Sequence, residues 1–274
     1  FMSTFEIGSR TARGGFDLEK LVVDKFNNWQ SDIDADRWLS VMGVEAKTIK
    51  NLMAQQIPTR IPRSICSKYG IELADFDEVS RFKKADVQVR VVIVLVDRIL
   101  VFNISVKKVS TTNGFNQIDK RPVSMYQSMW RFDDDVAYWL KAYTGEIFPQ
   151  SISGVDSARL KDPRRLNMNE IPPVKVKKIL DFFNANKYLI VADTIKGRGC
   201  LSAEWFIVGR ELDDNVEWII KPINEVVNHY CAGNAVASTQ GTIHLGRVTV
   251  QRKGGTPDPT SLQFKINPGE LFDV

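Results

Sequence analysis

The sequence predicts a mixed α/β or α+β fold, because patterns typical of strands and of helices alternate along the chain. Residues 87–94 carry β-branched side chains at alternating positions, which favours a strand. Apolar residues over 16–29 have helical spacing, and two prolines open a second helical pattern over 174–186. With 274 residues, 43% of them hydrophobic, the chain is long enough to bury a large core.

The N-terminal half is predicted to contain helices followed by a β-hairpin. After the helix at 16–29, the segment 38–54 is predicted to form one or two further short helices, and prolines interrupt the pattern at 58–62. The strand at 87–94 is followed by a plausible turn at Asp97-Arg98 and by a second apolar-rich segment over 99–109. These two segments predict an antiparallel hairpin.

The second half is predicted to alternate helices, loops and short strands. A polar stretch with an Asn113-Gly114 turn signal precedes an aromatic-rich helical segment at 124–143. A loop-rich basic segment at 151–169 leads to the helix at 174–186 and then to a short buried strand at 188–192. Further strands are predicted at 205–208, 216–220, 248–251 and 262–266. Since no linker or repeat divides the chain, we expect one domain over residues 1–274, with a helical insertion near 45–84.

Composition excludes several classes of site. The three cysteines are widely separated and the chain has two histidines, so neither a disulfide framework nor a multi-histidine metal site is expected. No apolar run has the length of a membrane span, and the N-terminus lacks the apolar stretch of a signal peptide, so a cytoplasmic protein is predicted. Residues 81–131 contain ten Lys or Arg and three Asp, a local net charge of +7 that weakly indicates an anionic partner.

The predicted hairpin brings together residues suited to phosphodiester hydrolysis. Asp86 opens its first strand, and Ser105 and Lys107 share one face near the end of the second. A carboxylate can hold a hard divalent cation, and a lysine can orient or deprotonate a water. The pattern is common, however, and taken alone it is more ordinarily interpreted as a turn aspartate beside a solvated strand lysine.

A family resemblance strengthens the catalytic interpretation. The chain resembles the HinP-type restriction endonucleases, which read GCGC, in several motifs that occur in the same order along nearly its whole length. These are Gly8-Ser9-Arg10-Thr11-Ala12, Gly15-Phe16 with Glu19-Lys20, the segment Gly114-Phe115-Asn116-Gln117-Ile118-Asp119-Lys120, Gly197-Arg198-Gly199 with Ala203-Glu204-Trp205, Gly246-Arg247-Val248-Thr249, Gln251-Arg252-Lys253-Gly254-Gly255, Leu262-Gln263-Phe264-Lys265 and Glu270-Leu271-Phe272-Asp273.

The resemblance implies a PD-(D/E)xK restriction-endonuclease core, in which helices flank a central mixed sheet. Asp86 matches its metal-binding aspartate and Lys107 its lysine, while Ser105 stands where the motif has an acidic residue. The resemblance also implies that the backbone carbonyl of Val106 faces the metal. Glu19 is our candidate for the missing carboxylate, although a solvated helix residue is about as expected there. The implied cofactor is Mg²⁺, with Mn²⁺ or Ca²⁺ as substitutes for binding.

Two segments are candidates for reading DNA. Asn116, Gln117 and Lys120, in a predicted loop, can hydrogen-bond base edges, and Phe115 can wedge between bases. The resemblance makes Gln117 and Lys120 the base contacts. The other segment is Gln251-Arg252-Lys253, where arginine can pair with guanine, and Arg198 is a further candidate. A turn with a buried phenylalanine and a strand-end basic turn are the alternatives.

The sequence therefore predicts a type II restriction endonuclease that cuts double-stranded DNA at a short GC-rich, GCGC-like site and leaves 5′-phosphate ends. The resemblance implies a homodimer and a cognate DNA methyltransferase in the same system, without direct contact between the two. Two alternatives remain open on the same core. One is a repair nuclease that recognises DNA structure, and the other is a non-catalytic DNA-binding module, which the serine at position 105 keeps in consideration.

Overall fold

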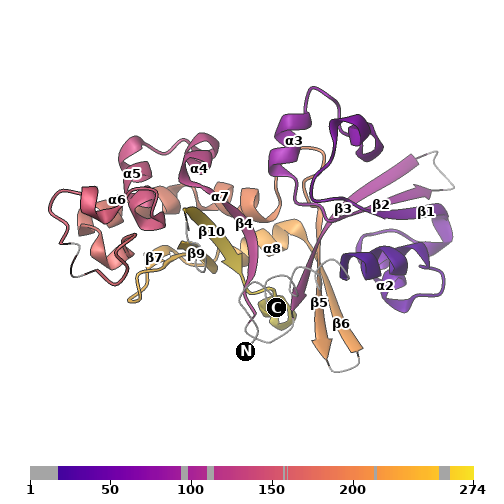
Figure 1. The fold of residues 1–274 in the computed structure, drawn as a ribbon. Helices are drawn as coiled ribbons and strands as arrows, with labels where there is room; N and C mark the ends of the chain where they lie inside the picture. The colour runs from indigo at the N-terminus through magenta and orange to yellow at the C-terminus, as the bar shows by residue number, and fades with distance from the viewer. Residues whose placement is uncertain are drawn as a thin grey trace, which may run out of the picture. The chain divides into compact units, whose positions relative to one another are not determined.

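A computed structural model describes residues 18–93, 98–109, 114–156, 158, 160–212, 215–252 and 260–274. They divide into two compact units, and Figure 1 shows the elements of each. The first unit holds the described residues up to 116 together with 195–226 and 267–274. The second unit holds residues 117–194 and 227–266.

The first unit is built on a five-stranded mixed sheet in the order β1-β2-β3-β5-β6. Strands β3 and β5 are parallel, and the other neighbours are antiparallel. A parallel pair needs a long crossover connection. Here the chain from β3 to β5 includes residues 117–194, which belong to the second unit. The strands are β1 (Ile49–Gln56), β2 (Val87–Ile93), β3 (Arg98–Val109), β5 (Trp205–Leu212) and β6 (Asn215–Pro222).

Helices flank this sheet, as predicted for a mixed α/β fold. The predicted hairpin is confirmed, since β2 pairs antiparallel with β3 and Val87 lies opposite Ile104. Buried side chains of the sheet pack against the helix at 18–27 and against Trp38. The other helices of this unit are α2 (Ile33–Val41), η1 (Ala46–Thr48), η2 (Arg63–Tyr69), α3 (Phe76–Phe82), the start of α8 (Ile223–Tyr230) and η6 (Pro268–Asp273).

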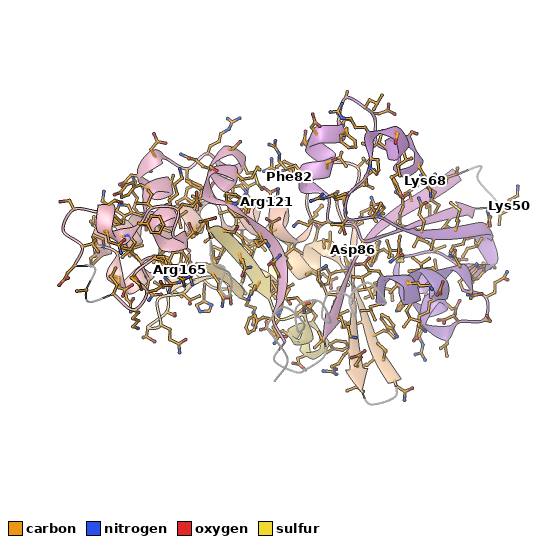
Figure 2. All side chains as sticks on the ribbon, viewed as in Figure 1. Lys50, Lys68, Phe82, Asp86, Arg121 and Arg165 are labelled. Carbon is orange, nitrogen blue, oxygen red and sulfur yellow. The ribbon has the colours of Figure 1, made fainter. Side chains whose placement is uncertain are left out.

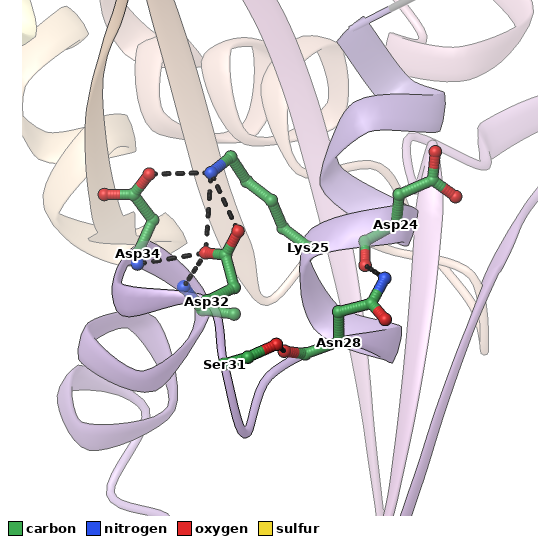
Figure 3. Close-up of polar contacts among 7 residues, drawn as sticks. Asp24, Lys25, Asn28, Ser31, Asp32 and Asp34 are labelled. Atoms are coloured by element: carbon green, nitrogen blue, oxygen red, sulfur yellow. Dashed lines mark hydrogen bonds and ion pairs between the residues drawn. The ribbon is translucent and has the colours of Figure 1, made fainter.

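A charged contact fixes the helix at 18–27 against α2 (Figure 3). Lys25 Nζ lies 3.0 Å from a carboxylate oxygen of Asp32 and 2.8 Å from one of Asp34. Asp32 also caps α2, because its Oδ1 accepts from the backbone N–H groups of Asp34 and Ala35, each at 3.0 Å. The orientation of the first helix, and of the side chains that it presents, is thus tied to the next element.

The prediction of helices through residues 38–54 is wrong for its second half. Residues 49–56 form β1, an edge strand that pairs with β2. Its sequence is rich in Lys, Asn and Gln, which have low strand propensity, so pairing with the neighbouring strand decides its structure. Asn27 reinforces this edge, since its side chain accepts from Ala54 N at 2.8 Å and donates to Ala54 O at 3.1 Å.

The second unit contains a five-stranded sheet in the order β4-β10-β9-β8-β7 and a set of helices. The strands are β4 (Asn116–Pro122), β7 (Ala235–Ala237), β8 (Ile243–Leu245), β9 (Val248–Arg252) and β10 (Ser261–Ile266). The helices are α4 (Val123–Trp130), α5 (Asp134–Thr144), η3 (Pro149–Ser151), η5 (Met168–Glu170), α6 (Pro173–Ala185) and α7 (Lys187–Ile195).

Aromatic rings join the helices of this unit to its sheet. Tyr126 and Trp130 of α4 stack with ring centroids 4.6 Å apart, and both meet Phe264 of β10 edge-on. Tyr143 of α5 donates to the carbonyl of Val250 in β9. The predicted helices at 124–143 and 174–186 and the predicted C-terminal strands are confirmed.

Two predictions for this unit are wrong. Residues 188–192 belong to helix α7, because a short apolar run fits a buried helix as well as a buried strand. Residues 116, 117 and 120, expected in a loop, lie in strand β4 beside β10. The polar segment before them falls partly on residues 110–113, which lie outside the described residues.

Two further expectations concern the chain as a whole. A single endonuclease domain with an insertion near 45–84 stays a prediction, and that segment holds strand β1 beside η1, η2 and α3. Among the helices that the structure describes, none combines the length and the apolar character that crossing a membrane requires.

Candidate active site

Asp86 lies directly before β2, at the point where the hairpin brings it beside β3 (Figure 2). Its backbone N–H donates to the carbonyl of Ile104 at 2.8 Å, and its own carbonyl accepts from Ile57 at 2.8 Å. The antiparallel ladder therefore extends through position 86 on both sides. Because Val87 pairs with Ile104, Asp86 stands beside Ser105.

The Asp86 carboxylate gathers the predicted catalytic residues of β3. Its Oδ2 accepts from the Ser105 hydroxyl at 3.0 Å, from the Val106 N–H at 2.8 Å and from Lys107 Nζ at 3.2 Å. Lys107 Nζ also donates to the Val106 carbonyl at 2.9 Å. The ammonium thus lies where two oxygen atoms converge, the carboxylate of Asp86 and the carbonyl of Val106.

Ser105 contributes a hydrogen bond and no charge to this cluster. Its side chain is buried, and its hydroxyl donates to Asp86. A hydroxyl at this position steadies the carboxylate, whereas an acidic residue would have added a second negative charge. The second carboxylate must therefore come from another element.

Glu19, on the helix at 18–27, is the predicted candidate for that carboxylate. Its Oε2 accepts from Gln56 of β1 at 3.4 Å. Burial and the nearby charge of Asp86 raise the pKa of Glu19 to about 7, although Lys107 and Lys83 oppose the effect. Gln56 lies opposite Val87, the residue after Asp86, so its bond to Glu19 places Glu19 near the start of β2.

Lys83 is a fourth charged group near Asp86, and it was not among the predicted site residues. It follows α3, three positions before Asp86. Burial lowers the pKa of Lys83, while the carboxylates of Asp86 and Glu19 raise it. The cluster thus holds two carboxylates and two ammonium groups at the ends of β2 and β3.

The oxygen atoms of this cluster fit a hard divalent cation. Carboxylates and a backbone carbonyl are the ligands that Mg²⁺ and Ca²⁺ prefer. The charge of Asp86 raises the cost of ionising Glu19, and a cation bound by both carboxylates would offset that cost. Among the described residues no group of three or more His, Cys, Asp or Glu could hold a metal, so these two carboxylates and the Val106 carbonyl are the candidate ligands.

A buried polar network supports the same face of the sheet beside the cluster. Gln88 Nε2 donates to Asn103 Oδ1 at 3.2 Å, across β2 and β3. Asn103 Nδ2 donates to the carbonyl of Cys200 at 2.8 Å, and its backbone N–H donates to Glu204 at 3.1 Å. Asn103 lies two positions before Ser105 on β3, so these bonds hold the strand in place next to Ser105.

The predicted DNA-reading residues have varied surroundings. Phe115, before β4, is 56% exposed, and Asn116 donates to the carbonyl of Lys108 at 3.0 Å. Gln117 and Lys120 are exposed on β4. These four residues lie close to the start of the second unit, at or just before β4.

Two of the remaining candidates, Arg252 and Arg198, contact groups of their own unit. Arg252 donates to the carbonyl of Leu166 at 3.0 Å and lies over the ring of Tyr143, and burial lowers its pKa. Gln251 is half-buried on β9. Arg198 lies over the ring of Phe82, with its guanidinium carbon 4.6 Å from the ring centroid. Lys253 lies outside the described residues.

Comparison with known proteins identifies the family. The model of the R.HinP1I restriction endonuclease matches residues 77–272, about 70% of the chain. The chain belongs to the R.HinP1I restriction endonuclease family. The segment 45–76, which carries β1 and η2, lies before the matched residues. Among curated protein sequences no significant match is found.

A solved structure supports the same architecture. The restriction endonuclease MspI, in complex with its cognate DNA, is similar in fold, with a TM-score of 0.62 and 13% sequence identity. The match covers 96% of this chain and 93% of the MspI chain. This R.HinP1I-family protein is thus a type II restriction endonuclease with the predicted fold of a mixed sheet flanked by helices.

Proposed function

We propose that this restriction endonuclease hydrolyses both strands of double-stranded DNA at a short GC-rich site, with the Asp86 cluster as its catalytic centre. The observation that carries the proposal is the convergence of Ser105, Val106 and Lys107 on one oxygen of Asp86, with the charge of Glu19 close by. GCGC is the first site to test, and the cut leaves 5′-phosphate and 3′-hydroxyl ends.

The residues of the cluster have distinct tasks in this proposal. Asp86, Glu19 and the Val106 carbonyl hold a divalent cation, Mg²⁺ in the cell, with Mn²⁺ or Ca²⁺ as substitutes for binding. When bound, such a cation acidifies water and offsets negative charge on the phosphate. Lys107 then orients the attacking water and adds positive charge beside the scissile phosphate. Ser105 keeps the Asp86 carboxylate turned toward β3.

The DNA-reading residues act from β4 and β9. Gln117, Lys120 and Gln251 present amide or ammonium groups for base edges, with Asn116, Phe115, Lys253, Arg252 and Arg198 as further DNA contacts. A homodimer would cut both strands of a symmetric site. A cognate methyltransferase protects host DNA in the cytoplasm and needs no contact with this protein.

Cleavage of an unmethylated plasmid of known sequence tests the proposal. Wild-type protein with Mg²⁺ is expected to give discrete bands that EDTA abolishes, and ligation of the products without a kinase step reports the 5′-phosphate. Lys107→Ala is expected to abolish the bands. Lys108→Ala, one residue away and paired with Glu211, is the matched control that keeps them.

Other outcomes separate the alternatives. An intact plasmid that the protein nevertheless binds would support a non-catalytic module. Cleavage only of nicked, branched or damaged DNA would support a repair nuclease. A smear that does not depend on Lys107 would point to a contaminating nuclease.

A further inference from the structure

Three glutamines form a row across the sheet of the second unit. Gln117 lies on β4, Gln263 on β10 and Gln251 on β9, and these strands are neighbours in that order. Gln263 pairs directly with Gln251 in the β10–β9 register. Its Nε2 donates to Gln117 Oε1 at 3.0 Å. Gln263, which was not among the predicted site residues, is thus the central member of the row.

The opposite face of these strands is apolar. Leu262 and Phe264, the neighbours of Gln263 on β10, are fully buried, and Val250 of β9 is buried opposite Phe264. Alternation along the strand separates this core face from the face of the glutamine row. Gln263 is nevertheless only 8% exposed. A buried amide is costly unless it is hydrogen-bonded, so its bond to Gln117 is a structural requirement of the position.

The direction of this bond determines what Gln117 presents to a ligand. An amide side chain accepts through its oxygen and donates through its NH₂ group. Since Gln117 Oε1 accepts from Gln263, its Nε2 remains to face outward, and Gln117 itself is exposed. An outward NH₂ group complements hydrogen-bond acceptors, such as O6 and N7 of guanine in the major groove.

We propose that Gln263 is a positioning residue that locks the Gln117 amide with its NH₂ group outward, and so restricts Gln117 to an acceptor edge such as that of guanine. This inference rests on the proposed function, namely that Gln117 contacts a base. Gln263 is too buried to reach the DNA itself, and it acts by removing the alternative orientation of its neighbour. Without it, Gln117 could rotate its amide and accept from adenine or cytosine as well.

Two kinds of substitution at position 263 test this role. Gln263→Leu removes the donor, so Gln117 is free to present either end of its amide. Gln263→Glu keeps the shape but only accepts hydrogen bonds when ionised, so Gln117 must turn its NH₂ group inward and its oxygen outward. The first change is expected to relax recognition, and the second to move it toward bases with donor edges.

The measurement is single-turnover cleavage of short duplexes that carry the mapped site or each of its single-base-pair variants. Gln263→Leu is expected to lower discrimination roughly 10- to 100-fold at one base pair, the same pair that Gln117→Leu affects. The double variant is expected to add little to either single one, since both remove the same contact. Gln240→Leu, in an exposed turn of the same unit, is the matched control.

The outcomes distinguish this inference from the proposed function. If Gln117→Leu relaxes one base pair while folded Gln263→Leu and Gln263→Glu proteins keep full discrimination, the inference is wrong and the proposed function stands. If the Gln263 variants slow cleavage of every duplex equally, Gln263 is merely structural. If wild-type protein yields no discrete site, the proposed function fails, and the inference fails with it. Thermal unfolding of each variant establishes that it is folded. If Gln263→Leu does not fold, Gln263→Glu alone provides the test.

Discussion

Two half-buried carboxylates, Glu19 in the first unit and Asp162 in the second, have opposite electrostatic environments. Burial and the charge of Asp86 raise the pKa of Glu19 to about 7. Burial also opposes ionisation of Asp162, but hydrogen bonds from Arg164 and Arg165 lower its pKa to about 2. One carboxylate is destabilised by its surroundings, and the other is stabilised by them.

We infer that this difference reflects a functional role for Glu19 and a structural role for Asp162. Asp162 accepts from Arg164 Nε at 3.1 Å and from Arg165 Nε at 2.8 Å, so the chain itself supplies the compensating charge. Glu19 accepts a long 3.4 Å bond from a neutral amide, and the charge of Asp86 opposes its ionisation. Carboxylates crowded in this way cost stability and are typical of sites that bind a cation or carry out catalysis.

The largest expected loss of cleavage comes from removing the Asp86 carboxylate, because Lys107 contacts it and a bound cation would contact it too. Asp86→Asn keeps the shape of the side chain but removes its charge. Cleavage is expected to fall by at least roughly 10³-fold, by analogy with the loss of one strong electrostatic contact in a transition state. Ca²⁺ is expected to raise the Tm of the wild-type protein by binding only the folded state, and this rise should be absent in Asp86→Asn.

Single-turnover cleavage and thermal unfolding with and without Ca²⁺ measure these two effects. Asp24→Asn, an exposed aspartate on the first helix, is the control for a change of charge alone. A Ca²⁺-dependent Tm rise that persists in Asp86→Asn would place the cation elsewhere.

Glu19→Gln is expected to lose activity and gain stability. The folded-state pKa of about 7 lies above the ordinary value of 4.5, so ionised Glu19 destabilises the fold. This cost begins above the ordinary pKa and is complete above about pH 7. The difference corresponds to at most about 3 kcal/mol, and solvent screening at a partly exposed group reduces it to about 1–2 kcal/mol.

Urea unfolding in EDTA, at pH 4 and pH 8, measures whether Glu19→Gln raises or lowers the free energy of unfolding. The variant should exceed the wild type in free energy of unfolding at pH 8, and the two should agree at pH 4. Cleavage with Mg²⁺ should fall roughly 10²-fold, as for a lost electrostatic contact. A variant that is less stable than wild type at pH 8 would contradict the assignment of Glu19 to the unsatisfied cluster.

Lys83→Met tests the second ammonium group of the cluster. Its loss removes a positive charge that favours ionised Glu19, so the pKa of Glu19 should rise further. Cleavage at pH 7 is expected to fall about tenfold, a smaller effect than for Lys107, which contacts Asp86 directly. The cleavage rate measured from pH 6 to pH 9 should recover part of this loss at high pH. A uniform loss across that range would show that Lys83 does not act through the carboxylates.

The strands of the hairpin and the residues around Asp86 could be predicted from the sequence because their signals are local. Alternating β-branched residues and a turn fixed the hairpin, and the hairpin alone places Asp86 beside Ser105 and Lys107. Glu19 lies 67 positions before Asp86, so only the family resemblance indicated its role. Lys83 carried no pattern at all, because its place in the cluster depends on how α3 ends against the sheet.

Other elements could not be predicted because tertiary contacts decide them. The strand at 49–56 owes its structure to pairing with β2 and to the Asn27 side chain, which is distant in sequence. The helix at 187–195 has a short apolar run that is ambiguous by itself. The role inferred for Gln263 depends on Gln117 of β4, a strand that lies far from β10 along the chain.

Asp162→Asn is expected to have the smallest effect of the series. It should lower the free energy of unfolding, whereas Glu19→Gln should raise it. The lowered pKa of about 2 means that ionised Asp162 stabilises the fold above its ordinary pKa, and that this stability is lost as the pH falls toward 2. The variant should therefore lose about 1 kcal/mol at pH 7, after allowance for screening, and should match the wild type near pH 2. Asp181→Asn, which breaks an exposed pair with Lys177, should change the free energy of unfolding by less than about 0.5 kcal/mol. Neutralising one carboxylate would thus strengthen the protein and neutralising the other would weaken it; a loss of stability in both variants would mean that Glu19, like Asp162, is satisfied by its own chain and has no need of a cation.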